Sequence, residues 1–342
     1  MAEMGGDLRR AVLRIVVFVR SKEGYRDAGS RGTHQRTMVE FVFTITQGRS
    51  GTKSLAELFT QHDGAALSVH ERVDANAHGL VTPDIGHMRR FNSHGLTGEI
   101  ANFWKRKLAM VREDTVKRGL KRYVETAHMN AKCGLVEYVL AAAANHDGDR
   151  FRFIVLNRAL DKIARSMHER HDMRQIENMW LWYLDPAYAR NIVDAMPYSG
   201  HGYLGLLTWY VREVEARKAR YKSSLSGKFD VLTIDIHQPD WIEIVSQGYG
   251  LNVPSGAAPI IANQNKTGDR RSALELQVRN LLAAIPVSTG TDKLSDSVRH
   301  AAFRRWIEDL NRERAVAEDA DILRGPGSGV GIGRGAFDEA RR

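Results

Sequence analysis

The chain has 342 residues, of which 43% are hydrophobic and 27% are charged. This composition is typical of a folded globular protein, and it excludes disorder as the main state of the chain. The 50 basic and 41 acidic residues leave a net charge of +9, which favours anionic partners. No block of five like charges forms a basic stripe. The pattern therefore favours small phosphorylated ligands and argues against nucleic acid as a partner.

Two features bear on the compartment of the protein. The apolar run at residues 15–19 is far shorter than the ~20 residues of a membrane-spanning helix. No small-residue cleavage site follows it, so we expect neither a span nor a signal peptide. The one cysteine, Cys133, excludes an intrachain disulfide and a cysteine-based zinc site. Together these features predict a cytoplasmic protein.

The first strong structural signal comes after an expected N-terminal extension, residues 1–38. Residues 39–46 are β-branched and aromatic, which predicts a buried strand. Residues 52–59 follow with apolar side chains at helical spacing. The pattern is therefore a strand, a tight turn and a helix.

The alternation of strands and helices continues along the chain. Further strands are predicted at residues 66–69, 123–126, 151–156 and 229–234, and further helices at 134–144, 160–170, 204–221 and 239–247. Strands that alternate with helices favour a parallel sheet with helices on both faces. We therefore predict a three-layer α/β fold with a central parallel sheet of about five strands.

Two segments depart from this rhythm. Residues 171–203 are rich in aromatic residues, Met and His, and are predicted to be an inserted lid or acceptor region. We expect the aromatic side chains here and in the next helix to serve mainly in core or lid packing: Trp180, Trp182, Tyr183, Tyr188, Tyr198, Tyr203 and Trp209. Residues 281–342 are predicted to be a helical and Gly-rich tail, because no strand precedes its glycine run as a dinucleotide-binding turn requires.

Basic residues lie beside the apolar stripe of the helix predicted at 204–221. They are Arg212, Arg217, Lys218 and Arg220. A charged run beside a core stripe is usually a solvated face, which is our expectation here. A site for an anionic acceptor is the alternative.

The turn after the first strand carries the first chemical signal. Gly48 and Gly51 allow the backbone to turn sharply, and the amides of residues 50–53 then converge at the start of a helix. Such an arrangement binds anions such as phosphate. A nucleotide-kinase loop would need glycines where this chain has Gln47 and Thr52, which argues against an ATP-dependent enzyme.

This turn resembles the 5′-phosphosulfate loop of sulfotransferases that use 3′-phosphoadenosine 5′-phosphosulfate (PAPS). In that loop a basic residue precedes Ser-Gly-Thr, and Arg49 takes the basic position here. The resemblance implies a set of donor contacts: Gly48, Arg49, Ser50, Gly51, Thr52 and Lys53. It further implies that Arg49 acts on the charge that develops during transfer. Lys53 departs from the family, which commonly has a second Thr at that position.

A second motif follows the strand predicted at 151–156. Arg158 and Ser166 are eight residues apart, and two helical turns cover about seven residues, so both side chains can reach one ligand. This spacing resembles the 3′-phosphate site of the same sulfotransferases. The resemblance implies that Arg158 pairs with the 3′-phosphate and that Ser166 adds a hydroxyl. A looser match suggests that Lys266 and Arg270 belong to a basic loop over that phosphate.

The resemblance covers about residues 39–271, including a late strand, helix and Pro-ended turn at 229–254. It implies a P-loop-like fold and a sulfotransferase-like domain at residues 39–280. It also implies PAPS as co-substrate, the 3′,5′-bisphosphate (PAP) as product, and a reaction that requires no metal.

Sulfuryl transfer needs a base that takes the acceptor proton. Glu71, at the end of the second predicted strand, resembles the base of tyrosylprotein-type and several bacterial sulfotransferases, and is the first candidate. His128, after the next strand, resembles the position of the base in cytosolic sulfotransferases. A solvated pair of His70 and Glu71, and a His128 that only bonds a helix end, are the open alternatives. Glu125 and His128 lack a third ligand in the pattern, so no metal site is predicted.

These motifs predict an enzyme that moves a sulfuryl group from PAPS to a hydroxyl or amine. The acceptor is expected to be a small molecule, a glycan or a natural product. Two other functions remain open. One is a P-loop small-molecule kinase, which would need ATP and Mg²⁺, and the other is a non-catalytic nucleotide-binding protein of the same fold.

Overall fold

The structure is a computed structural model of the chain. It describes residues 37–71, 82–142, 148–169, 184–254 and 270–287, and seven residues between 301 and 312. Residues from Met38 onward belong to one compact unit. Most of the expected N-terminal extension, the first part of the expected insertion and the Gly-rich tail lie outside the described residues. None of the described helices is long and apolar enough to cross a membrane.

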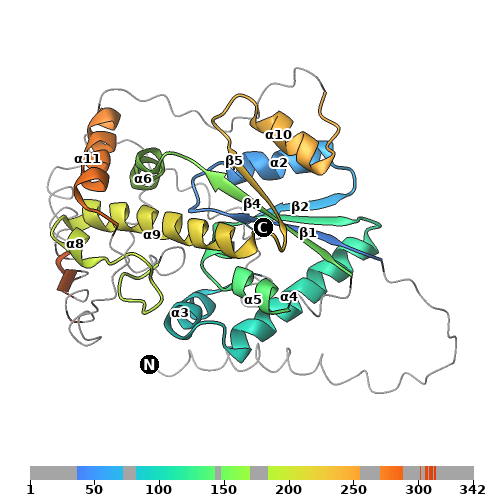
Figure 1. The fold of residues 1–342 in the computed structure, drawn as a ribbon, viewed down its shortest axis with the longest axis horizontal. Coiled ribbons are helices and arrows are strands. Elements are labelled where there is room, and N and C mark those ends of the chain that lie inside the picture. Colours follow the sequence, from blue (N-terminus) through green and yellow to red (C-terminus); the bar gives the residue numbers. More distant parts are fainter. Residues whose placement is uncertain are drawn as a thin grey trace, which may run out of the picture. The chain divides into compact units, whose positions relative to one another are not determined.

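The centre of the fold is a five-stranded sheet in which every described pair of neighbouring strands is parallel (Figure 1). The order of the strands across the sheet is β2-β3-β1-β4-β5. The strands are β1 (Glu40–Ile45), β2 (Ala66–His70), β3 (Arg122–Thr126), β4 (Arg150–Asn157) and β5 (Asp230–Asp235). The predicted α/β class and all five predicted strands are confirmed.

Helices cover both faces of this sheet. They are α2 (Thr52–His62), α3 (Ile85–His94), α4 (Gly98–Lys117), the 3-10 turn η1 (His128–Ala131), α5 (Leu135–Ala142), α6 (Leu160–Glu169), α8 (Met196–Ser199), α9 (Gly202–Leu225), α10 (Trp241–Tyr249) and α11 (Arg270–Ala284). The helices α3, α4 and α11 were not among the predicted elements. A capping box begins α3, in which an Asp84 carboxylate oxygen accepts from the His87 amide at 2.8 Å.

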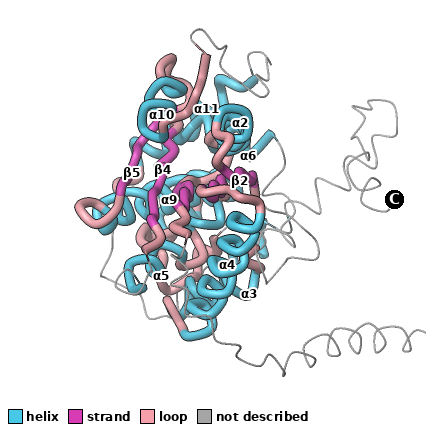
Figure 2. Tube along the Cα trace, turned by 90° about the vertical axis from the view of Figure 1, so that its right-hand side faces the viewer, coloured by secondary structure: helices cyan, strands magenta, loops and turns pink. Residues whose placement is uncertain are grey.

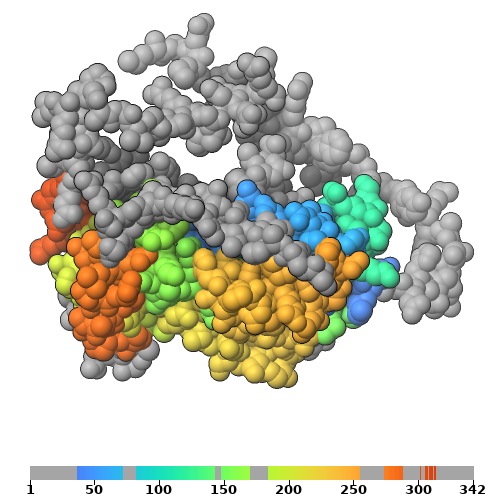
Figure 3. All heavy atoms as spheres, turned by 90° about the horizontal axis from the view of Figure 1, so that it is seen from above, coloured from blue at the N-terminus to red at the C-terminus, as the bar shows by residue number. Residues whose placement is uncertain are grey.

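The two apolar faces of the strands form two separate cores. Along β1, the side chains of Phe41, Phe43 and Ile45 join the larger core, and Val42 joins the smaller one. This alternation is the two-residue period of a strand. The larger core lies under α3, α4, α5, α6, α9 and α11, and the smaller core lies under α2 and α10. Figure 2 shows helices on both sides of the strands, and Figure 3 views α2 and α10 from above.

The connections that follow β1, β3 and β4 diverge at the carboxyl end of β1. The chain leaves β1 into α2 on one face, whereas it leaves β3 and β4 into α5 and α6 on the other face. In open parallel sheets, ligands bind outside the carboxyl ends of the strands where neighbouring connections diverge in this way. The fold therefore puts the turn after β1 at the centre of the edge where a ligand is expected.

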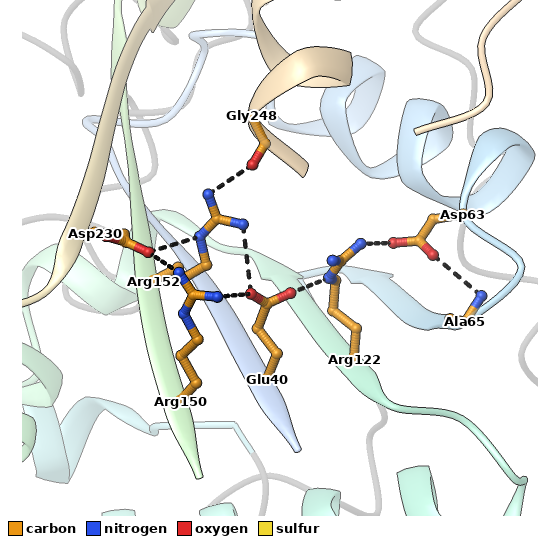
Figure 4. Close-up of polar contacts among 8 residues, drawn as sticks. All are labelled: Glu40, Asp63, Ala65, Arg122, Arg150, Arg152, Asp230 and Gly248. Carbon is orange, nitrogen blue, oxygen red and sulfur yellow. Dashed lines mark hydrogen bonds and ion pairs between the residues drawn. The ribbon is translucent and has the colours of Figure 1, made fainter. Parts of the chain in front are cut away.

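The opposite edge of the sheet is closed by charged side chains (Figure 4). Glu40 accepts from Arg122 Nε and, at 3.4 Å, from Arg152 Nη1. Arg152 also donates to the Gly248 carbonyl at 2.7 Å, and its guanidinium lies 3.9 Å from the centre of the Tyr249 ring. These contacts join the amino ends of β1, β3 and β4 to the end of α10. This edge is therefore occupied by internal contacts.

One ion pair lies in the interior between α4 and β3. Lys107 Nζ donates to Glu125 Oε1 at 2.7 Å, and the Tyr123 hydroxyl donates to Glu125 Oε2 at 2.7 Å. The two charged side chains are at most 3% exposed. Glu125 is therefore held by an ammonium and a phenol as part of the core.

Two of the four basic residues expected on a solvated face of α9 are buried, so that expectation is wrong for them. Arg217 is 3% exposed and Lys218 is 2% exposed. Arg217 donates to Glu213 Oε1 at 2.6 Å and to Asn92 Oδ1 at 2.7 Å. The physical reason is that α9 is covered by neighbours on several sides, so its charged side chains are paired inside.

The described part of the predicted insertion packs on α9. Glu213 accepts from the amides of Ile192 and Val193, each at 2.8 Å, and the Trp209 indole donates to the Val193 carbonyl at 3.1 Å. Tyr188, Tyr198 and Trp209 are buried, as the core-packing interpretation predicts. Trp180, Trp182 and Tyr183 lie outside the described residues.

We predict that Lys107→Met lowers the free energy of unfolding by about 3–5 kcal/mol, because it leaves the Glu125 carboxylate buried without its cation. Urea denaturation measures this loss. Lys105→Met on the exposed face of the same helix is the matched control, with an expected change within about 0.5 kcal/mol. Equal losses in the two variants would contradict the structural role assigned to the pair.

Candidate functional site

The structure places the sequence-predicted site residues after the carboxyl ends of four neighbouring strands. Residues 46–51 follow β1, Glu71 follows β2, His128 follows β3 and Arg158 follows β4. Because parallel strands end at the same edge of a sheet, these residues share one edge. Arg270 is the first residue of α11, and Lys266 lies outside the described residues.

Hydroxyl groups inside the turn after β1 hold its shape. The Thr46 hydroxyl donates to Ser50 Oγ at 2.8 Å, and the Ser50 hydroxyl donates to the Gly48 carbonyl at 3.0 Å. The turn needs this support because Gly48, Arg49 and Gly51 all have positive φ, at 87°, 57° and 87°. The Ser50 hydroxyl therefore shapes the turn from within.

Arg49 and Glu71 share an uncommon backbone conformation. They are the two non-glycine residues with positive φ in the described part of the chain, at 57° and 41°. A side chain with a Cβ in such a region costs on the order of 1–3 kcal/mol, and such residues gather at functional sites. Both residues were singled out from the sequence for chemical reasons that do not involve the backbone.

Close packing on either side confines the turn. A Cβ on Gly51 would lie 1.8 Å from Ile236 Cδ1, and a Cβ on Gly48 would lie 3.4 Å from His128 Cβ. Gly51 is also the N-cap of α2, and its carbonyl accepts from the Leu55 amide at 3.1 Å. Because Gly51 has no side chain to accept from them, the first amides of α2 are available to a ligand.

We predict that Gly51→Ala destabilises the protein by more than the about 1–2 kcal/mol that a left-handed backbone costs, because the new methyl group meets Ile236. Ile236→Ala in the same chain removes the clash, so the double variant is expected to lose less than the sum of the two single losses. Urea denaturation of all three variants tests this coupling.

Gly64→Ala is the control, because a Cβ at Gly64 would meet nothing within 4 Å. Additive losses in the Gly51 and Ile236 variants would contradict the predicted contact.

Lys53 lies on the outer side of α2. Its side chain is 65% exposed and forms an ion pair of 3.8 Å with Glu57, one helical turn away. Thr52, by contrast, is buried at the start of the helix. Among residues 48–53, Lys53 is therefore the one whose side chain forms a surface ion pair within α2.

Two arginines and a serine meet beside the turn. Arg158 Nη1 donates to the Arg49 carbonyl, and Arg49 Nε donates to Ser166 Oγ at 3.2 Å. Arg49 therefore contacts both residues, Arg158 through its backbone carbonyl and Ser166 through its side chain. Burial, followed by the nearby charges of Arg165 and Arg49, lowers the pKa of Arg158. Partly desolvated like charges repel one another, so an anion bound among them would relieve this repulsion.

The two candidate bases face each other across β2 and β3. His128 Nε2 lies 3.6 Å from Glu71 Oε1. His70 turns back toward the sheet, where its Nδ1 lies 3.0 Å from the Thr126 carbonyl. His70 is exposed, and its described hydrogen bonds are with Thr126.

His128 is held as a neutral imidazole. Burial first, and then the charges of Lys132, His70 and Arg49, lower its pKa well below 6.5. The side chain is 9% exposed, and that of Glu71 is 26% exposed. When a buried neutral imidazole lies beside a partly exposed carboxylate, one of the two groups can donate a proton and the other can accept one.

Sequence reasoning missed two residues behind this pair. Lys132 Nζ makes a hydrogen bond with His128 Nδ1 and lies 3.0 Å from the Tyr210 hydroxyl. Tyr210 in turn donates to the Gln47 carbonyl at 3.0 Å, which links the base region to the turn after β1. One signal was available, because Lys132 is four residues after His128 and such residues can meet across one helical turn.

No family model matches the chain, and no curated protein matches it. Among solved structures, the chain is similar to "Sulfotransferase Domain from the Curacin Biosynthetic Pathway", with 12% sequence identity and a TM-score of 0.35. The match covers 80% of this chain and 97% of that one.

Proposed function

We propose that the protein is a sulfotransferase that moves a sulfuryl group from PAPS to a hydroxyl or amine of a small molecule, a glycan or a natural product. The observation that carries the proposal is the meeting of Arg49, Arg158 and Ser166 beside the amino end of α2. These residues carry the resemblance to both phosphate sites of PAPS enzymes. Two segments more than a hundred residues apart in the chain meet at the edge where the fold predicts a ligand.

In this proposal, each end of the donor has its own partners. The 5′-phosphosulfate lies against the first amides of α2, where the helix dipole favours negative charge, and Arg49 lies beside it. The 3′-phosphate lies against Arg158 and Ser166, whose N–H and O–H groups donate to it. Catalysis then comes from positioning and from charge stabilisation.

The chemical step balances without a further reactant. The acceptor oxygen or nitrogen forms a bond to the sulfur, and the bond from sulfur to the bridging phosphate oxygen breaks. The electron pair of that bond leaves with the bisphosphate. The acceptor proton goes to Glu71 or His128, which follow β2 and β3 and lie 3.6 Å apart.

We predict that PAP stabilises the protein against heat and that ATP does so much more weakly, because Arg158 and Ser166 select a 3′-phosphate. A ligand at one hundred times its Kd adds about 2.7 kcal/mol of stability, which a thermal-shift assay detects. Losing a buried charged hydrogen bond costs roughly 2–5 kcal/mol, so Arg158→Ala should weaken PAP binding at least about tenfold.

Arg118→Ala is the matched control for Arg158→Ala, because this arginine is 57% exposed and pairs only with Asp114 on its own helix among the contacts described. PAP binding should be unchanged in it. Equal affinity of the native protein for PAP and ATP would overturn the PAPS assignment and favour the kinase alternative. PAP binding without sulfate transfer would favour a non-catalytic nucleotide-binding protein.

We predict that Arg49→Ala lowers turnover more than it lowers PAP affinity. The reason is that an interaction that strengthens as charge develops appears chiefly in the rate. Transfer of radiolabelled sulfate from PAPS to a cell extract, together with the thermal-shift titration of PAP, measures the two effects. If rate and affinity fall in step, Arg49 serves only in binding.

A further inference from the structure

A buried lysine lies directly behind the two candidate bases. The Lys132 side chain is fully buried, and its Nζ contacts His128 Nδ1 and the Tyr210 hydroxyl. The ammonium also lies 5.4 Å from the centre of the Tyr210 ring. Since the Tyr210 hydroxyl donates to the Gln47 carbonyl, its oxygen accepts from Lys132. Lys132 Nζ is therefore held by His128 on one side and by Tyr210 on the other.

The contact with Lys132 determines which nitrogen of His128 carries the proton. An ammonium has three donors and no acceptor, so His128 Nδ1 must accept from a charged Lys132. A neutral imidazole whose Nδ1 accepts carries its proton on Nε2. That atom faces Glu71 Oε1 at 3.6 Å. In this state His128 presents a donor to the site, and Glu71 presents an acceptor.

We propose that Lys132 is a positioning residue that fixes His128 in the Nε2–H tautomer, so that Glu71 and not His128 takes the acceptor proton. The assignment of the base rests on the proposed function. The tautomer of His128 does not, because it follows from contacts within the protein.

The charges around Lys132 and His128 define a pH range for this arrangement. Burial lowers the pKa of Lys132 to about 7, while Cys133 and Glu71 raise it and Arg217 lowers it. The folded-state pKa is lowered, so the ammonium is present below about pH 7 and is lost as the pH rises through that value. His128, whose neighbours are Lys132, His70 and Arg49, stays neutral to well below pH 6.5. Between the pKa of His128 and the pKa of Lys132, a charged Lys132 therefore faces a neutral His128 imidazole.

The same contacts predict a change at higher pH. A neutral lysine can also accept a hydrogen bond, so the restriction on His128 Nδ1 is lifted. His128 can then carry its proton on Nδ1 and present an unprotonated Nε2 to the site. The tautomer is therefore expected to be uniform below about pH 7 and mixed above it.

The first experiment observes His128 in the full-length protein without any ligand. Nuclear magnetic resonance of isotope-labelled histidine separates the two tautomers by their ring-nitrogen shifts, and His128→Asn identifies the signal. Below the Lys132 pKa of about 7, we expect the Nε2–H tautomer in the native protein. The Nδ1–H tautomer or an imidazolium in that range would overturn the proposal.

The variants test whether Lys132 is the cause. Lys132→Met removes the charge at similar length, so His128 should show mixed tautomers and a higher pKa. Tyr210→Phe is the matched control, since it removes a hydroxyl from the same cluster and leaves the contact from Lys132 to His128. It should keep the Nε2–H tautomer. An unchanged His128 signal in a folded Lys132→Met protein would overturn the proposal.

The second experiment measures sulfate transfer and separates this proposal from the proposed function. Glu71→Gln should lower transfer by roughly 10²–10⁴-fold while stabilisation by PAP persists. Lys132→Met should change the pH profile of transfer, which a purely structural role would not do. Full transfer in Glu71→Gln with loss in His128→Asn would overturn the base assignment. Absence of transfer by the native protein would overturn the proposed function, and the tautomer of His128 would still decide the role of Lys132.

Discussion

The structure depends on one constraint, the reversal of the chain after β1. This strand lies between β3 and β4. The chain leaves it into α2 on one face of the sheet, whereas β3 and β4 lead into α5 and α6 on the opposite face. The connection to α2 spans residues 46–51 and has left-handed backbone at Gly48, Arg49 and Gly51. The same turn points the first amides of α2 toward the edge of the sheet. The turn that connects β1 to α2 is thus also the feature that favours an anion.

Much of the sheet was predictable because buried parallel strands are continuous apolar runs. The helix α4 was not predicted, although its buried Ile100, Phe103, Trp104, Leu108 and Val111 lie at helical spacing. The burial of Lys107 on the same face was a different matter. The lysine belongs there because Glu125 lies on β3, a partner that no local pattern reveals. Hydrophobic periodicity therefore indicates the helix and does not indicate the paired charges in its core.

The candidate site was predictable in its local motifs and not in its long-range contacts. The spacing of Arg158 and Ser166 indicated that they converge, and the glycines indicated the turn. The hydrogen bond from Arg158 to the Arg49 carbonyl joins segments from different strands, and the part played by Lys132 depends on Tyr210 of a distant helix. Buried Arg217 shows the same limit, since its partners come from α3 and α9. Such contacts are set by the order of strands in the sheet.

The strand order also has a consequence for how the protein folds. The register pairs Glu40 of β1 with Arg122 of β3 and with Arg150 of β4, so the central strand has only partners that are far away in sequence. Pairings between distant segments form slowly, because the intervening chain must first give up its freedom. During synthesis, β1 leaves the ribosome long before either neighbour, and its apolar side chains remain without cover until then. The turn that favours an anion is thus expected to acquire its shape among the last parts of the sheet, when β4 docks beside β1.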